Sequence, residues 1–153
     1  MKKRSCCVTG HRDIPADKLA YVEAELREAV GAAIRSGYTR FISGFAEGTD
    51  LIFASIVTEA KAEYPNIILE AAIPYASQLK NKDPFFQKMI ACCSAVHVLC
   101  EKYSVNSFFV RNRYMISESD CVIAVYDGRE KGGTVFSIRY AYTLGKELKV
   151  IEI

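Results

Sequence analysis

The chain has 153 residues, half of them hydrophobic, and a formal net charge of +2 at pH 7. This length suits a single hydrophobic core, so we expect residues 1–153 to form one domain. Apart from a short run at the start, the basic residues are spread along the chain, which is not the pattern of a sequence-independent nucleic-acid binder. No apolar run reaches the ~18 residues of a membrane span, and no signal-peptide core follows Met1, so we expect a cytoplasmic protein that contacts no membrane.

The six cysteines lie within apolar segments, which is typical of reduced core residues rather than of a secreted disulfide framework. Neither adjacent cysteine pair has the C-x-x-C spacing of a zinc or redox site, and His11 and His97 have no second ligand at a suitable spacing. We therefore expect no metal and no resident cofactor.

Apolar runs and helical patterns alternate along the chain, which predicts an α/β fold. We expect a three-layer, Rossmann-like domain with a mostly parallel sheet of about six strands and helices on both faces. The predicted strands cover residues 5–9, 40–43, 67–73, 95–100, 121–126 and 148–153.

Five helices are predicted between these strands. An apolar stripe from Leu19 to Ile34 recurs every three or four residues and predicts an amphipathic helix that ends before Gly37. The other helices are expected from near Gly48 to before Pro65, from Asp83-Pro84 onward, over 107–118 and over 134–144.

The strand-to-helix turns of such a sheet meet at its carboxyl edge, where free helix amides and the positive end of the helix dipole favour phosphate or carboxylate. In the turn after the first strand, Gly10 permits a tight bend and Arg12 can reach an anionic group. A loop glycine beside a solvated arginine explains this pair equally well.

The turn after the second strand carries two glycines and two carboxylates. Gly44 and Gly48 let the backbone approach a ligand closely. Glu47 and Asp50 would repel phosphate, so we expect them to accept hydrogen bonds from ribose hydroxyls. For Asp50 the alternative is a structural role at the helix start, worth about 0.3–1 kcal/mol.

The turn after the fifth strand ends in Gly132, Gly133 and Thr134, which form the best phosphate cradle of the three turns. Its spacing is not that of a Walker P-loop, and G-x-G-x-x-G is absent, so the chain does not carry either standard nucleotide motif.

Two neighbouring segments add candidate ligand contacts. On the helix before the fifth strand, Arg111 and Asn112 share one face, whereas Arg113 lies on the opposite side. Tyr75 follows the third strand, where its ring could stack on a base, although a tyrosine at a strand end is more often half-buried packing.

Five motifs stand in this order: residues 9–12 (TGHR), 43–50 (SGFAEGTD), 73–75 (IPY), 111–115 (RNRYM) and 126–134 (YDGREKGGT). Together they resemble the YpsA-like (DUF1273) family of the SLOG superfamily, which also holds the DNA-processing protein DprA and the LOG cytokinin-activating phosphoribohydrolases. The resemblance spans nearly the whole chain. It implies a Rossmann-like bacterial protein that binds a nucleotide or nucleotide-derived ligand at the carboxyl edge of the sheet, with a poorly defined activity.

The resemblance to LOG enzymes, which cleave an N-glycosidic bond, is incomplete. Arg111 matches their helix arginine and Gly133-Thr134 their Gly-Thr pair, whereas Ser137 stands where they carry a glutamate. A serine has no carboxylate to stabilise an oxocarbenium-like transition state or to act as acid or base. The sequence thus leaves open whether the protein is an enzyme.

We therefore predict a homo-oligomeric protein that binds a nucleotide-like small molecule, with sensing or signalling as one use of that binding. A nucleotide N-ribohydrolase is one alternative. A DprA-like module for single-stranded DNA is the other, but near-neutral charge and the carboxylates of the second turn suit a small ligand better than a positive groove with aromatics. The predicted ligand-binding residues are Gly10, Arg12, Gly44, Glu47, Gly48, Asp50, Tyr75, Arg111, Asn112, Gly132, Gly133 and Thr134.

Overall fold

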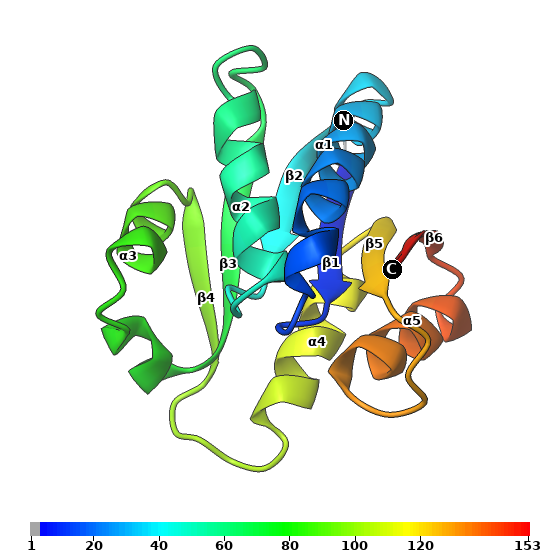
Figure 1. The fold of residues 1–153 in the computed structure, drawn as a ribbon. Coiled ribbons are helices and arrows are strands. Elements are labelled where there is room, and N and C mark those ends of the chain that lie inside the picture. The colour runs from blue at the N-terminus through cyan, green and yellow to red at the C-terminus, as the bar shows by residue number, and fades with distance from the viewer. Residues whose placement is uncertain (1–3) are drawn as a thin grey trace.

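Six strands form one sheet in the order β4-β3-β2-β1-β5-β6 in the computed structural model, which describes residues 4–153 (Figure 1). Every neighbouring pair in this sheet is parallel. The predicted α/β fold is therefore confirmed, and no strand end differs from its prediction by more than two residues. The strands are β1 (Arg4–Gly10), β2 (Tyr38–Ser43), β3 (Ile68–Tyr75), β4 (Ala95–Cys100), β5 (Cys121–Tyr126) and β6 (Glu147–Glu152).

All five predicted helices are present. They are α1 (Leu19–Arg35), α2 (Thr49–Ala60), α3 (Pro84–Ala91), α4 (Ser107–Ser117) and α5 (Gly133–Thr143), with short 3₁₀ turns η1 (Ala16–Lys18) and η2 (Ala76–Lys80). Asp83 caps α3, because its carboxylate accepts the Phe85 N–H at 3.1 Å. The apolar stripe of α1 is buried from Val22 to Ala33, whereas Ile34 is half-buried and Leu19, at the first position of the helix, is 40% exposed.

The helices cover the sheet in two layers. Helices α1, α2 and α3 pack on one face, and α4 and α5 on the other (Figure 1). Successive residues of β1 alternate between the two cores, with Cys6 and Val8 in the larger core and Cys7 in the smaller one. Because β1 is central, residues 5–8 are buried on both faces, and three of them, Cys6, Cys7 and Val8, are consecutive apolar residues.

The direction in which the chain adds strands reverses beside β1. Strands β2, β3 and β4 extend the sheet to one side, and the chain then returns to place β5 and β6 on the other side. Gly10, at the end of β1, pairs with Val125 near the end of β5. In open α/β sheets such a reversal separates the two loops that follow the strands and leaves a crevice at the carboxyl edge.

All six cysteines are free; Cys6, Cys7 and Cys121 are buried and the other three are half-buried. Among residues 4–153 no group of three or more potential metal ligands converges. Within the same range, none of the helices is long and apolar enough to cross a membrane.

Candidate functional site

A cavity of about 480 Å³, hereafter the main cavity, opens at the carboxyl ends of β1 and β5. Its walls come from the loops after β1, β2 and β5, from the first turns of α2 and α5, and from one face of α4 with the loop before it. It therefore lies at the reversal of strand order. Seven of the predicted ligand-binding residues line it: Gly10, Arg12, Asp50, Arg111, Asn112, Gly133 and Thr134.

Three other predicted glycines do not line the main cavity. The Gly44 carbonyl accepts a hydrogen bond from Arg111 Nη1 at 2.6 Å. A Cβ at Gly44 would stand 2.7 Å from both Arg111 Nη1 and Asp50 Oδ2, so the missing side chain makes room for these two groups. Gly48 precedes α2 and packs against the backbone of residues 11 and 12, and Gly132 is the N-cap of α5.

The other two predicted residues lie outside the main cavity as well. The Tyr75 ring packs edge-to-face against Tyr103 and Phe108, and Phe108 is the member of this group that lines the main cavity. Glu47 is exposed and lines a neighbouring cavity instead. Their ligand roles remain predictions.

Arg111 is a buried arginine, only 5% exposed. Besides its bond to Gly44, its Nε donates to Asn112 Oδ1 at 2.8 Å. Arg113, two residues along α4, is exposed, so the predicted opposite facing of the two arginines is confirmed.

Asp50 is the buried charge that faces Arg111. Its carboxylate is 7% exposed and accepts the Ala46 N–H at 3.3 Å. Burial raises the pKa of Asp50, and the nearby Arg111 cation opposes that rise. Burial likewise lowers the pKa of Arg111, and the Asp50 carboxylate opposes that change. The two groups therefore stabilise each other's charged forms beneath the main cavity.

Arg12 differs from Arg111 in being exposed. Its guanidinium lies over the Phe108 ring, 5.1 Å from the ring centroid, and forms no hydrogen bond or ion pair with any residue from 4 to 153. Arg111 lies 5.7 Å from the same ring. Arg12 thus presents a positive charge to the main cavity that the described protein groups leave free.

The first turn of α5 also faces the main cavity. Gly132 precedes the helix with a φ of +118° and no side chain caps the helix. Gly133 and Thr134 line the cavity directly. The first amides of a helix have no acceptor within the helix, so this turn offers N–H donors and a positive dipole end to an anion.

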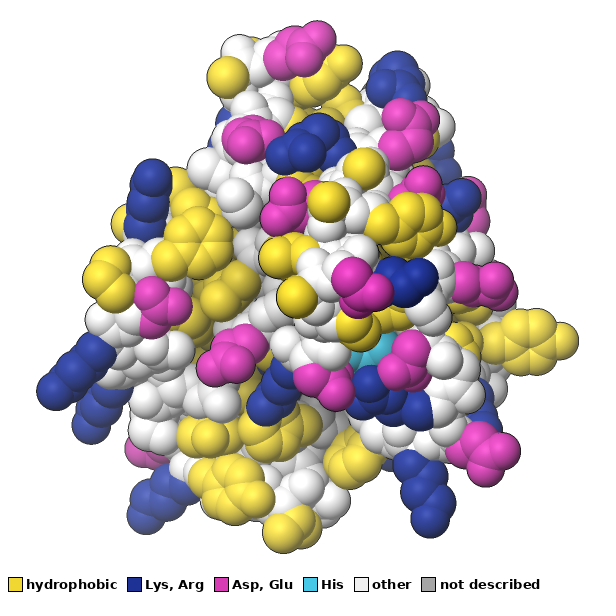
Figure 2. Space-filling view, in the orientation of Figure 1, with side chains coloured by type: hydrophobic (Ala, Val, Ile, Leu, Met, Phe, Trp, Pro, Cys, Tyr) yellow, Lys and Arg dark blue, Asp and Glu magenta, His cyan; other side chains and the backbone are white. Residues whose placement is uncertain are grey.

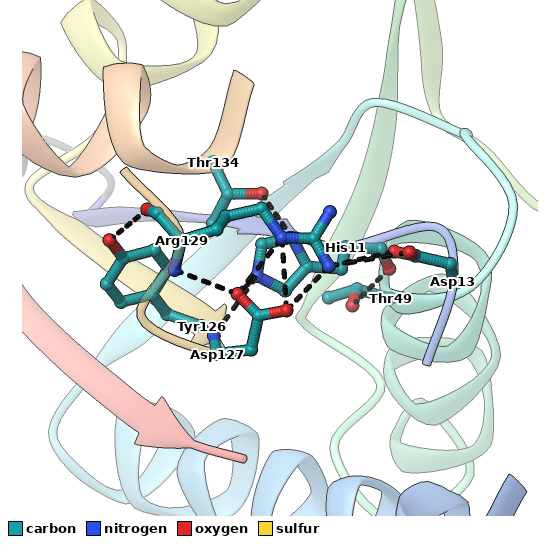
Figure 3. A network of polar contacts seen from close by, with 7 residues as sticks. All are labelled: His11, Asp13, Thr49, Tyr126, Asp127, Arg129 and Thr134. Atoms are coloured by element: carbon teal, nitrogen blue, oxygen red, sulfur yellow. Dashed lines mark hydrogen bonds and ion pairs between the residues drawn. The ribbon is translucent and has the colours of Figure 1, made fainter. Parts of the chain in front are cut away.

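His11 lies between the two loops and is only 4% exposed (Figure 3). Its Nε2 accepts the backbone N–H of Asp127 at 3.1 Å, and its Nδ1 lies 3.4 Å from Thr134 Oγ1. An Nε2 that accepts this bond places the ring proton on Nδ1, toward Thr134. Burial is the main cause that lowers the pKa of His11, with a contribution from the nearby Arg129 cation. The Asp127 carboxylate, whose Oδ1 lies 3.1 Å from Nε2, opposes this change, but the net direction of the pKa shift favours the neutral ring.

The loop after β5 is held by ion pairs around His11 (Figure 3). Arg129 pairs with Asp127 and, at 3.3 Å, with Asp13 from the loop after β1. The Tyr126 hydroxyl donates to the Arg129 carbonyl. These contacts lower the pKa of Asp127, and the hydrogen bond from Arg129 is the largest cause.

Sequence reasoning did not select His11, Asp127 or Arg129 as site residues, although all three lie in motifs that it singled out. Their partners are more than 100 residues apart in the chain, as the His11–Asp127 and Arg129–Asp13 contacts show. One sequence signal could have identified His11 as a site residue, because it closely follows the apolar run of a predicted strand.

A family model matches nearly the whole chain. The model of the YpsA family, described as the YspA SLOG family, matches residues 6–150. The chain belongs to this family. The predicted family resemblance is therefore confirmed.

Relatives of this family member occur in bacteria. The UPF0398 protein of Bacillus pumilus is 27% identical over 137 residues, which cover 85% of this chain and 72% of that protein. The UPF0398 protein of Bacillus thuringiensis is 24% identical over 131 residues, which cover 82% of this chain and 71% of that protein.

Two solved structures share the fold. DNA processing protein A from Helicobacter pylori, described for its single-stranded DNA binding mode, aligns with a TM-score of 0.67 and 23% identity over 96% of this chain. The chain spans 64% of the length of that protein. The protein TM1055 aligns with a TM-score of 0.64 and 19% identity, over 95% of this chain and 72% of that one. At these identities, the similarity shows only that this chain shares the fold of the two proteins.

Replacing His11 by glutamine tests the neutral state of the ring. Because the folded chain resists protonation at His11, the unfolded chain binds more protons below pH 6.5, the ordinary imidazole value. The free energy of unfolding should therefore fall as the pH drops from 7.5 to 5.5, a range that spans the unperturbed histidine pKa of about 6.5. In His11→Gln the amide oxygen can still accept the Asp127 N–H but does not titrate, so urea unfolding should show a weaker pH dependence. An unchanged pH dependence would contradict a neutral, buried His11.

Replacing Arg111 by methionine tests its buried contacts. The change removes the donor to Gly44 and the cation facing Asp50, so we expect a loss of about 1.5–3 kcal/mol in the free energy of unfolding. Arg113→Met is the matched control, and its exposed position should keep the effect within about 0.5 kcal/mol. In the Arg111→Met background, Asp50→Asn should recover part of the lost stability, because it removes the unpaired carboxylate. Equal losses of stability in Arg111→Met and Arg113→Met would contradict this role of Arg111.

Proposed function

We propose that the protein binds a nucleotide or nucleotide-derived molecule in the main cavity, with its phosphate at the first turn of α5. The observation that carries this proposal is the convergence of two anion-binding features. The uncapped start of α5 and the free guanidinium of Arg12 face the same cavity, at the reversal of strand order. Helix amides and an arginine are the groups that proteins use to hold phosphate.

The rest of the main cavity suits the nucleoside portion of such a ligand. Phe108, Phe109 and Met115 supply apolar surface, and the side-chain amide of Asn112 is polar. Small-molecule sites combine such apolar walls with a few polar groups that fix orientation. Phe109 is 41% exposed, which leaves aromatic surface available for a base.

Binding without hydrolysis is favoured by the carboxylates present. The two that line the main cavity are Asp13, paired with Arg129, and Asp50, buried opposite Arg111. Ser137, which stands at the position of the LOG glutamate, is 1% exposed, and its hydroxyl has no partner among residues 4–153. Neither aspartate is a free carboxylate poised beside a sugar.

Single-stranded DNA is a second candidate ligand, supported by the shared fold with DNA processing protein A. Strand binding of this kind uses a continuous positive groove. Acidic and basic side chains are interspersed over the face shown in Figure 2, without a continuous basic stripe. We therefore rank the small ligand first.

Isothermal titration calorimetry with inorganic phosphate, the common nucleoside monophosphates and a short single-stranded oligonucleotide tests the proposal. At least one monophosphate should bind, and Arg12→Met should weaken it while Arg113→Met does not. Methionine keeps much of the stem over Phe108 and removes only the charge. If only the oligonucleotide binds, the second candidate is favoured. An equal loss of affinity in Arg12→Met and Arg113→Met would contradict the role of Arg12.

Gly133→Val should weaken nucleotide binding by about tenfold, equal to ~1.4 kcal/mol, without unfolding the domain. A Cβ at Gly133 meets only Asn112 Nδ2, at an ordinary 3.4 Å, so alanine fits and serves as the milder control. The branched valine obstructs close approach of phosphate to the α5 amides. Calorimetry decides the matter, and unchanged affinity in a folded valine variant would place the ligand elsewhere.

The protein should release no free base from nucleoside monophosphates at a useful rate. Departure of the base creates positive charge on the ribose, and loss of one stabilising group typically costs ~100 to 1,000-fold in rate. Chromatography after incubation with a panel of purine and pyrimidine monophosphates measures this, beside Ser137→Glu. Turnover by the unmodified protein that Glu47→Gln abolishes would instead establish a hydrolase that uses Glu47.

A further inference from the structure

A second cavity adjoins the main one on the side of β2 and β3, and its volume is about 520 Å³. Arg12 and Ala46 line both cavities. The second cavity follows the same carboxyl edge, since its other residues come from the loop after β2, from α2, from η2, from α3 and from the segment between η2 and α3. The free guanidinium of Arg12 therefore stands where the two cavities meet.

The second cavity has an apolar floor and a polar rim. Phe45 and Phe86 form the floor as an edge-to-face pair, 5.6 Å between ring centroids. Ser77, Gln78 and Lys80 of η2 contribute to the rim. Phe45 and Phe86 are only 3% and 1% exposed, so they form an apolar base rather than a stacking surface. A heterocycle over this base, with a hydroxylated sugar at the polar rim, matches the distribution.

The charges of the two cavities differ. In the second cavity two cations, Arg12 and Lys80, are balanced by two carboxylates, Glu47 and Asp83. This balance favours an uncharged polar group there. The main cavity has three arginines against two aspartates and the uncapped start of α5, which favours phosphate.

We propose that the ligand has two nucleoside-like halves joined by a phosphate bridge, with Arg12 at the bridge and the second half in the second cavity. This inference rests on the proposed function and extends it to the class of ligand. Among sheets with such a reversal of strand order, those that bind dinucleotides hold them across the crevice at that point. The exposed Glu47 then acquires the ribose-binding role predicted from sequence, but toward the second half of the ligand.

Calorimetry with three probe types tests this inference, each made with the four common bases: nucleoside monophosphates, phosphodiester-linked dinucleotides and pyrophosphate-linked dinucleotides. A two-part probe should bind about tenfold or more tightly than the matching monophosphate, because its second half binds intramolecularly. The phosphodiester and pyrophosphate arms decide which bridge fits.

Ser77→Trp separates the two cavities. Ser77 is exposed on η2, so the indole can fill the second cavity without disturbing the core. It should abolish the advantage of the two-part probe and leave monophosphate affinity unchanged. Ser36→Trp, at the exposed end of α1, is the matched control and should change neither affinity.

The outcomes distinguish the inference from the proposed function. If monophosphates bind and two-part probes bind no better, the inference is wrong and the proposed function stands. The same conclusion follows if Ser77→Trp leaves the advantage intact. If no probe of any type binds, both are wrong.

Discussion

His11 joins the segments that form the main cavity. Its carbonyl accepts the Thr49 N–H at 3.3 Å and the Thr49 hydroxyl at 3.0 Å, which fixes the start of α2 to the end of β1 (Figure 3). Its ring connects to the loop after β5 and to the first turn of α5. The bond from the Asp127 N–H requires an unprotonated Nε2, and a proton there would exchange this bond for one to the Asp127 carboxylate, whose Oδ1 lies 3.1 Å away. The positions of the three segments around the cavity thus depend on the contacts of one buried residue.

The arginines beside this ring divide two tasks. Arg111 is buried, and its hydrogen bonds go to Gly44 and Asn112, so its charge is balanced within the protein. Arg12 is exposed, rests on an aromatic ring and keeps its hydrogen-bond donors free toward the cavity. A buried and compensated cation gives rigidity, whereas a free cation beside uncapped helix amides can bind an anion. This division supports a binding protein with a preformed anion site.

Much of the fold was predictable because local rules and tertiary packing agree. The apolar runs are the strands, Asp83-Pro84 opens α3, and the stripe of α1 faces the core. Parallel topology then brings the strand-end turns to one edge, and Gly10 and Gly133, which are far apart in the chain, both line the main cavity. Their role in ligand binding stays a prediction.

The contacts within the site were less predictable, because they join distant parts of the chain. The burial of Arg111 follows from the absence of a side chain at Gly44, 67 residues earlier. Tyr75 is the last residue of β3, and its ring packs against Tyr103 from the loop before α4 and does not line the main cavity. Sequence periodicity assigns a residue to an element and a face, but not to a partner in a distant loop.

The central claim is that the first turn of α5 and the loop after β1 bind phosphate. Nuclear magnetic resonance with isotope-labelled protein, titrated with a nucleoside monophosphate, observes each backbone amide separately. The account predicts that the amide signals of Gly133, Thr134 and Arg12 shift most and saturate together. Larger shifts around Arg40 and Glu118, which line a separate cavity, with little change at α5 would contradict it.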